Sequence, residues 1–98
     1  MKEAALLKVK VVAAKDQVSA DLSGEVVVLN FKNGVYYGLD SVGTRVWNLI
    51  QKPTKMDEIT SCLAKEYNVE PKECQRDVLG LVKGLLAEGL IEIKDGVD

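Results

Sequence analysis

The predicted elements follow an order typical of an α+β domain of winged helix-turn-helix type, with a small antiparallel N-terminal sheet followed by three helices. Two observations predict this fold. Through residues 7–39 apolar side chains alternate with polar ones or form a short run, as in strands, and beyond them apolar residues recur at helical spacing. The chain has 98 residues, of which 47% are apolar. This size and composition predict a single domain over 1–98 that buries its own core.

Three strand candidates come first. In 7–11 and 18–22 apolar residues alternate with lysines or with small polar residues. Ser23-Gly24 is the expected turn after the second candidate. Residues 26–29, VVVL, are all apolar, which predicts a short strand buried on both faces.

Asn33-Gly34 is the strongest short-range signal in the chain. It predicts a hairpin, because both residues tolerate the positive φ of a type I′ turn. The last strand of this hairpin leaves an open edge, whose N–H and C=O groups can pair with another strand. Alternation along that strand places Val35, Tyr37 and Leu39 on one face and Tyr36 and Gly38 on the other.

Helical spacing predicts helices over 42–51, 56–67 and 71–88. Asp40 or Ser41 is expected to cap the first helix, because short polar side chains accept a bond from the first free N–H groups.

The other helix ends also carry signals. Thr54 is the expected N-cap of the second helix, and Asn68 fits the left-handed position after its end. Pro71 suits the first turn of the third helix, and Gly89 ends it. A short terminal strand is expected at Leu90, Ile91 and Ile93.

The third helix is unusually apolar. Its apolar residues span an arc of about 160°, whereas about 100° is enough to cover a core. The surplus indicates that this helix covers the core and a second surface. Gly80 and Gly84 lie on the opposite side, and no feature of the sequence accounts for them. The arc consists of Cys74, Val78, Leu79, Leu81, Val82, Leu85 and Leu86.

The amino-acid composition argues against catalysis and metal binding. The chain has no histidine, so it lacks the commonest general base and metal ligand. Cys62 and Cys74 lie on apolar helix stripes and are expected to be reduced core residues. Neither enzymatic activity nor a metal or cofactor is therefore expected.

Charge and hydropathy restrict the location and the partners. Thirteen basic and 15 acidic residues give a net charge of −2, whereas a nucleic-acid binder normally has a basic excess. No apolar run reaches the ~20 residues of a membrane helix, and residues 1–17 do not resemble a signal peptide. A cytoplasmic protein that binds neither nucleic acid nor membrane is expected.

Residues 34–50, GVYYGLDSVGTRVWNLI, resemble the central signature of the PqqD-like family. Leu39-Asp40, Gly43 and Val46-Trp47 match its pattern of a strand ending in Leu-Asn or Leu-Asp and a helix with Gly and Ile/Val-Trp. The resemblance covers roughly 17–93. Further matches are Pro53-Thr54, Glu58-Ile59, Leu63, Tyr67-Asn68-Val69, Asp77-Val78, Leu81 and Gly89-Leu90-Ile91.

The resemblance implies three strands, three helices and no catalytic activity. Domains of this family bind the leader of a ribosomally synthesised precursor peptide, which adds as a further strand beside the third strand and against the third helix. The turn Phe31-Lys32-Asn33-Gly34 differs from the Pro-x-Gly-like turn of the PqqD protein proper. The strand-helix signature is closer to stand-alone versions from lasso-peptide pathways.

A binding site follows from the open edge, the apolar arc and the resemblance. The implied partners are a precursor peptide and a separate maturation enzyme, such as a leader peptidase or a radical SAM enzyme. The protein itself is expected to be a monomer or weak homodimer. The alternatives are a winged-helix DNA-binding regulator and an adaptor that binds protein strands outside any such pathway. The backbone of Val35, Tyr36, Tyr37, Gly38 and Leu39 is expected to pair with the leader, and the helix side to come from Gln75, Val78, Leu79 and Val82, with Cys74, Leu81 and Leu85 as replacements.

Overall fold

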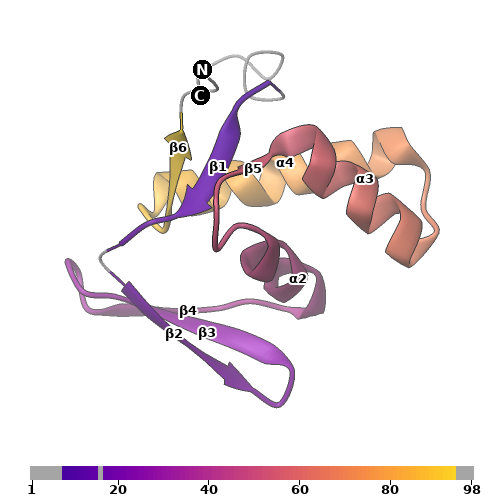
Figure 1. Ribbon diagram of the computed structural model, residues 1–98. Helices are drawn as coiled ribbons and strands as arrows, with labels where there is room; N and C mark the ends of the chain where they lie inside the picture. The colour runs from indigo at the N-terminus through magenta and orange to yellow at the C-terminus, as the bar shows by residue number, and fades with distance from the viewer. Residues whose placement is uncertain (1–7, 16, 95–98) are drawn as a thin grey trace.

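The computed structural model describes residues 8–15 and 17–94. This part of the chain forms two three-stranded antiparallel sheets and three helices (Figure 1). The predicted α+β, winged helix-turn-helix-like fold is confirmed, with its strands divided between two sheets. The first sheet has the order β5-β1-β6, with β1 at Lys10–Ala13, β5 at Thr54–Lys55 and β6 at Ile91–Lys94. The second has the order β2-β3-β4, with β2 at Gln17–Leu22, β3 at Glu25–Asn30 and β4 at Val35–Gly38.

The helices begin and end within two residues of their predicted bounds. They are α2 (Ser41–Leu49), α3 (Met56–Tyr67) and α4 (Pro71–Ala87). Asp40 caps α2, since its Oδ1 accepts a hydrogen bond from the N–H of Gly43 at 2.8 Å. Asn68 ends α3 in the left-handed conformation with φ 52°, as its short polar side chain permits.

The predicted cap at Thr54 is wrong. Thr54 lies in β5, where it pairs with Val11 of β1. Its hydroxyl donates to the carbonyl of Leu49 at 2.8 Å. Lys55 occupies the N-cap position of α3 without a side-chain cap. Pairing of the two strands therefore overrides the local capping preference.

The two-residue type I′ turn forms in the first hairpin, at Ser23-Gly24, and not at Asn33-Gly34, where it was predicted. Ser23 and Gly24 form a two-residue loop and both have positive φ, 59° and 88°, as a type I′ turn requires. In the next hairpin only Gly34 has positive φ, at 69°. Its N–H donates to the carbonyl of Asn30 at 2.8 Å across a four-residue loop. The hairpin predicted from Asn33-Gly34 is confirmed, but its type I′ turn is not.

The second sheet packs one face against α2. Val26 and Val28 of β3 are buried on that face, and the N–H of Val26 donates to Thr44 Oγ1 in α2 at 2.9 Å. Val27 and Leu29 point the other way and are only half-buried. The prediction that β3 is buried on both faces is therefore wrong, because no described helix covers the outer face. The strand predicted over 7–11 begins only at Lys10 and runs to Ala13 as β1, so this prediction agrees over 10–11 alone, and Leu7 lies outside the described residues.

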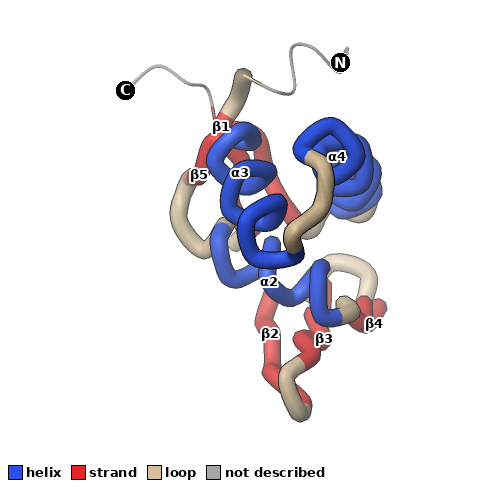
Figure 2. The backbone as a smooth tube through the Cα atoms, turned by 90° about the vertical axis from the view of Figure 1, so that its right-hand side faces the viewer, coloured by secondary structure: helices blue, strands red, loops and turns tan. Residues whose placement is uncertain are grey.

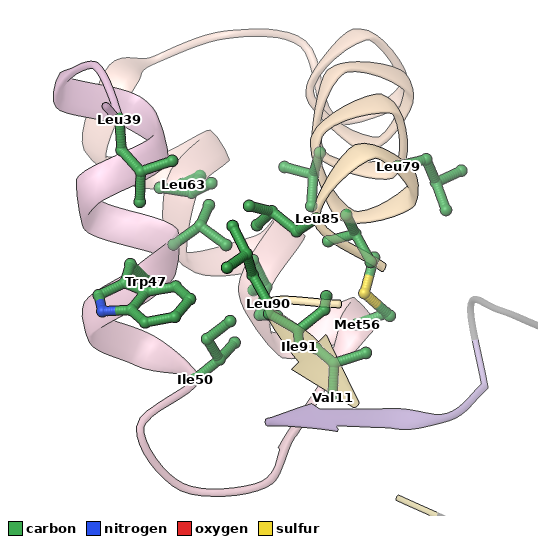
Figure 3. Close-up of a cluster of buried hydrophobic side chains, with 14 of the residues drawn as sticks. Val11, Leu39, Trp47, Ile50, Met56, Leu63, Leu79, Leu85, Leu90 and Ile91 are labelled. Carbon is green, nitrogen blue, oxygen red and sulfur yellow. The ribbon is translucent and has the colours of Figure 1, made fainter. Parts of the chain in front are cut away.

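The core lies between the three helices and the first sheet and extends to Val26 and Val28 of the second; Figure 3 shows part of it. Val11, Ile50, Met56 and Leu90 are fully buried there. Trp47 is 2% exposed and packs in the same core. No helix of the described residues is long and apolar enough to cross a membrane.

Candidate functional site

β4 forms one edge of the second sheet, since β3 is its neighbour and no described strand lies on its other side. The ladder determines which backbone groups remain unpaired. The N–H of Leu39 donates to the carbonyl of Val26 at 2.8 Å, and hydrogen-bonded pairs alternate along an antiparallel ladder. The backbone N–H and C=O groups of Tyr37 therefore also face β3. The N–H and C=O groups of Tyr36 and Gly38 point toward the open edge.

A groove of about 530 Å³ lies between this edge and α4. Figure 2 shows β4 as the strand of its sheet nearest to α4, with β2 on the far side. The lining is mostly apolar or glycine, so the groove offers space for side chains while the strand edge offers hydrogen bonds. Its lining residues are Tyr36, Tyr37, Gly38, Leu39, Gly80, Leu81, Gly84, Leu85, Glu88 and Leu90.

The two helix glycines explain the depth of this groove. Gly80 and Gly84 are four residues apart, so they lie on the same face of α4, and both line the groove. A Cβ atom built on either residue meets no atom within 4 Å. Packing within the chain therefore does not require glycine at these positions. The periodicity of apolar residues does not identify groove-lining glycines, because in that pattern a glycine appears only as an unfavourable residue within the helix.

A hydrogen-bonded cluster closes one end of the groove. The hydroxyl of Tyr37 donates to Glu88 Oε2 at 2.8 Å and accepts from Asn33 Nδ2 at 3.2 Å. The hydrogen bond to the Glu88 carboxylate raises the pKa of Tyr37 above its ordinary value, because it favours the neutral hydroxyl. The side chain of Tyr37 thus ties β4 to the end of α4.

Most of the predicted strand residues line the groove, but the predicted helix residues do not. Tyr36, Tyr37, Gly38 and Leu39 all line the groove. Val35, at the start of β4, is 44% exposed and is not part of its lining.

On the helix side, the groove is lined by other residues than the four predicted. Val78 and Val82 are 2% and 0% exposed and belong to the core. Gln75 and Leu79 line a separate depression on α4 together with Lys72, Arg76 and Lys83. Figure 3 shows Leu79 on the side of α4 away from Leu39.

The wide apolar arc of α4 is thus largely used by the core. Leu81 and Leu85, which were expected only as replacements, line the groove. Cys74, the third replacement, is 5% exposed and belongs to the core. The side of α4 that faces β4 is the edge of the arc next to the two glycines.

The cysteines are free thiols in different surroundings. Cys74 is buried, and burial raises the pKa of its thiol. Cys62 is only half-buried, beside the guanidinium of Arg45 at 3.7 Å. Among the described residues, no three His, Cys, Asp or Glu side chains gather closely enough to hold a metal ion.

Comparison with known proteins gave one family match and several similar structures. The family model for coenzyme PQQ synthesis protein D, PqqD, matches residues 25–91. A search of curated proteins found no match.

Three solved structures share the fold. TbiB1 in complex with the TbiA(beta) leader peptide is 33% identical, with a TM-score of 0.78, and the alignment covers 83% of this chain and 94% of that one. A lasso peptide synthetase B1 complexed with the leader peptide is 21% identical, with a TM-score of 0.76 and coverage of 84% and 96%. The PqqD truncation of Methylobacterium extorquens PqqCD, described as a stand-alone recognition element for ribosomally synthesised and post-translationally modified peptides, is 18% identical, with a TM-score of 0.70 and coverage of 85% and 88%.

Proposed function

Because the chain belongs to the family of coenzyme PQQ synthesis protein D, whose model matches residues 25–91, we propose that it binds the leader segment of a ribosomally synthesised precursor peptide. The leader adds as a strand to the open edge of β4 and places its side chains in the groove against α4. The chain itself is non-catalytic, and it presents the bound precursor to a separate modifying enzyme. The observation that carries this proposal is the unpaired strand edge beside a mostly apolar groove.

The groove supports recognition rather than turnover. Backbone groups of Tyr36 and Gly38 are available for two rungs of a ladder. Each apolar leader side chain buried in the groove is worth about 1.5–3 kcal/mol. The similar structures support the same assignment, since the TbiB1 structure, at 33% identity, holds a leader peptide.

The proposed site combines strand and helix residues. Tyr36, Tyr37, Gly38 and Leu39 supply the strand side, while Val35, which the sequence predicted with them, lies outside the groove lining. On the helix side the proposal assigns Gly80, Leu81, Gly84 and Leu85 in place of the four residues predicted from the sequence, because these line the groove. The enzyme that receives the peptide is proposed by class only, a leader peptidase or a radical SAM enzyme. The protein is proposed to act as a monomer or weak homodimer.

A proline at the open edge tests strand addition. Tyr36→Pro removes the N–H that faces the ligand and leaves the β3 ladder intact, because proline is tolerated at a strand edge. Tyr36→Val is the matched control, since it removes the same ring but retains the N–H. The probe is the fluorescein-labelled TbiA(beta) leader, the peptide held in the similar TbiB1 structure, titrated by fluorescence anisotropy.

Strand addition predicts that Tyr36→Pro binds at least tenfold more weakly than Tyr36→Val, with both variants folded by circular dichroism. Equal affinities would exclude strand pairing at this edge. A duplex DNA titration tests the winged-helix regulator, which the leader-bound similar structures do not support. Binding of strand-forming peptides without binding of the leader would instead identify an adaptor.

A further inference from the structure

The groove continues past the end of β4 into two further depressions. One, of about 280 Å³, lies between the start of α2 and α4 and shares Leu81 with the groove. The other, of about 430 Å³, lies beside the start of β3 and shares Gly38 and Leu39 with the groove. Both include Asp40. A peptide strand paired with β4 therefore meets these depressions as it leaves the sheet.

The charged residues that line these three connected spaces are carboxylates. Glu88 lies at one end of the groove, Asp40 and Asp77 lie at the other end, and Glu25 lines the third space. Within residues 8–15 and 17–94, no lysine or arginine is part of the lining of any of the three.

The charged residues of α4 and its C-cap that line a depression are divided between two flanks of the helix. Asp77 and Glu88 border the connected spaces. Lys72, Arg76 and Lys83 line the depression on the opposite flank, and Gly80 lies between the two sets. A chain of net charge −2 thus concentrates anionic groups along the path of the proposed ligand. Low-dielectric walls around such a path focus the field on the ligand.

We infer that the groove selects a leader with positively charged residues next to its apolar strand, so that lysine or arginine side chains reach Asp40 and Asp77 where the strand leaves β4. This inference rests on the proposed function, which defines the ligand as a peptide in this groove. The depression at Asp77 also fits the chemistry of such side chains. Val42, Val78 and Leu81 supply an apolar floor for the aliphatic stem, and the two carboxylates accept from the cationic head.

The test does not depend on the identity of the natural leader. A library of random twelve-residue peptides is selected by mRNA display against three immobilised proteins: the wild type, Asp77→Lys and Glu92→Lys. Glu92 is exposed on β6 and lines none of the three connected spaces. Glu92→Lys is therefore a control that makes the same change of charge as Asp77→Lys outside the proposed path of the peptide. Asp77 is chosen because Asp40 also caps α2.

The expected result is a change in the selected charge at fixed peptide positions. Peptides from the wild type and from Glu92→Lys carry excess lysine or arginine beside an alternating apolar segment, whereas Asp77→Lys loses this excess or selects acidic residues instead. A synthetic peptide from the wild-type pool binds Asp77→Lys about five- to tenfold more weakly. The variant replaces a surface ion pair between Asp77 and the cationic side chain of the peptide by a repulsion between two cations.

Two results would overturn the inference, and they are distinguishable. Enriched apolar peptides without a charge preference, bound equally by wild type and Asp77→Lys, would refute the charge selection and leave the proposed function intact. If no peptide is enriched on folded wild type, or if the enriched peptides bind Tyr36→Pro as well as Tyr36→Val, both the inference and strand addition at β4 fail.

Discussion

Replacing Gly84 by alanine is expected to stabilise the protein and weaken its binding. Gly84 lies in the last third of α4, where glycine costs about 0.5–1 kcal/mol relative to alanine. The new Cβ meets no atom within 4 Å, so the folded state suffers no clash. The free energy of unfolding should rise by about that amount. For a domain of this size, 1 kcal/mol corresponds to a melting temperature about 4–8 °C higher.

The same methyl group points into the space assigned to the leader. Adding a methyl to a well-packed contact costs about 1–3 kcal/mol, and each 1.4 kcal/mol is about a tenfold change in affinity. Leader binding should therefore weaken about five- to hundredfold. Gly80→Ala should behave in the same direction, since Gly80 lines the same groove.

Thermal unfolding by far-UV circular dichroism measures the first effect, and calorimetric titration with the leader peptide measures the second. Ser61→Ala is the matched control, because Ser61 is an exposed residue inside α3 that lines none of the spaces around β4. It should raise helix stability slightly and leave affinity unchanged. A Gly84→Ala variant that is more stable and binds with unchanged affinity would refute close approach of the ligand to α4. A less stable variant would refute the open space at this position.

Three further outcomes follow from the packing and the charges. Val82→Ala removes a side chain that is 0% exposed, so urea denaturation should show a loss of about 2–3 kcal/mol; a loss below about 1 kcal/mol would contradict its core position. The Arg45 guanidinium, whose Nε donates to both carboxylate oxygens of Glu66 at 2.9 and 3.0 Å, lowers the pKa of Glu66 below its ordinary value. A lowered carboxyl pKa gives stability that is present above the unfolded pKa and lost as pH falls through the folded one, so the melting temperatures of wild type and Glu66→Gln should differ at neutral pH and converge in acid, where the Glu66 carboxyl is protonated. Cys62 is half-buried and Cys74 is buried with a raised thiol pKa, so Ellman's reagent should modify one thiol quickly and the other slowly, and Cys62→Ser should remove the fast phase.

Local signals predicted element types better than turn and cap details. Pro71, Asn68 and Asp40 fix helix ends through their own backbone and side chain, and these predictions agree with the structure. Thr54 has the same kind of side chain, but β1 pairs with its backbone. That contact joins residues 43 positions apart, and no local pattern contains it.

The turns show the same limit. Asn33-Gly34 and Ser23-Gly24 both tolerate positive φ, so either satisfies the local requirement for a type I′ turn. The paired residues decide between them. Leu22 pairs with Glu25, which leaves two residues in the first loop, whereas Asn30 pairs with Val35, which leaves four in the second. The number of loop residues is set by the register of whole strands, which the sequence specifies through burial of Val26 and Val28 rather than through the turn itself.

The lining of the groove between β4 and α4 was predictable from the sequence mostly on its strand side, for one physical reason. The sequence of the hairpin predicts that β4 is an open edge, but the register determines that the backbone groups of Tyr36 and Gly38 face it while those of Tyr37 and Leu39 face β3. A groove forms where side chains are small or absent, so it depends on residues that the apolar pattern does not mark. The apolar residues Val78 and Val82 mark where α4 is filled by the core, while Gly80 and Gly84 mark where it is left open. Those glycines cost helix stability and relieve no clash within the chain. Under the proposed function they leave space for the leader, so Gly84→Ala should raise stability and lower affinity.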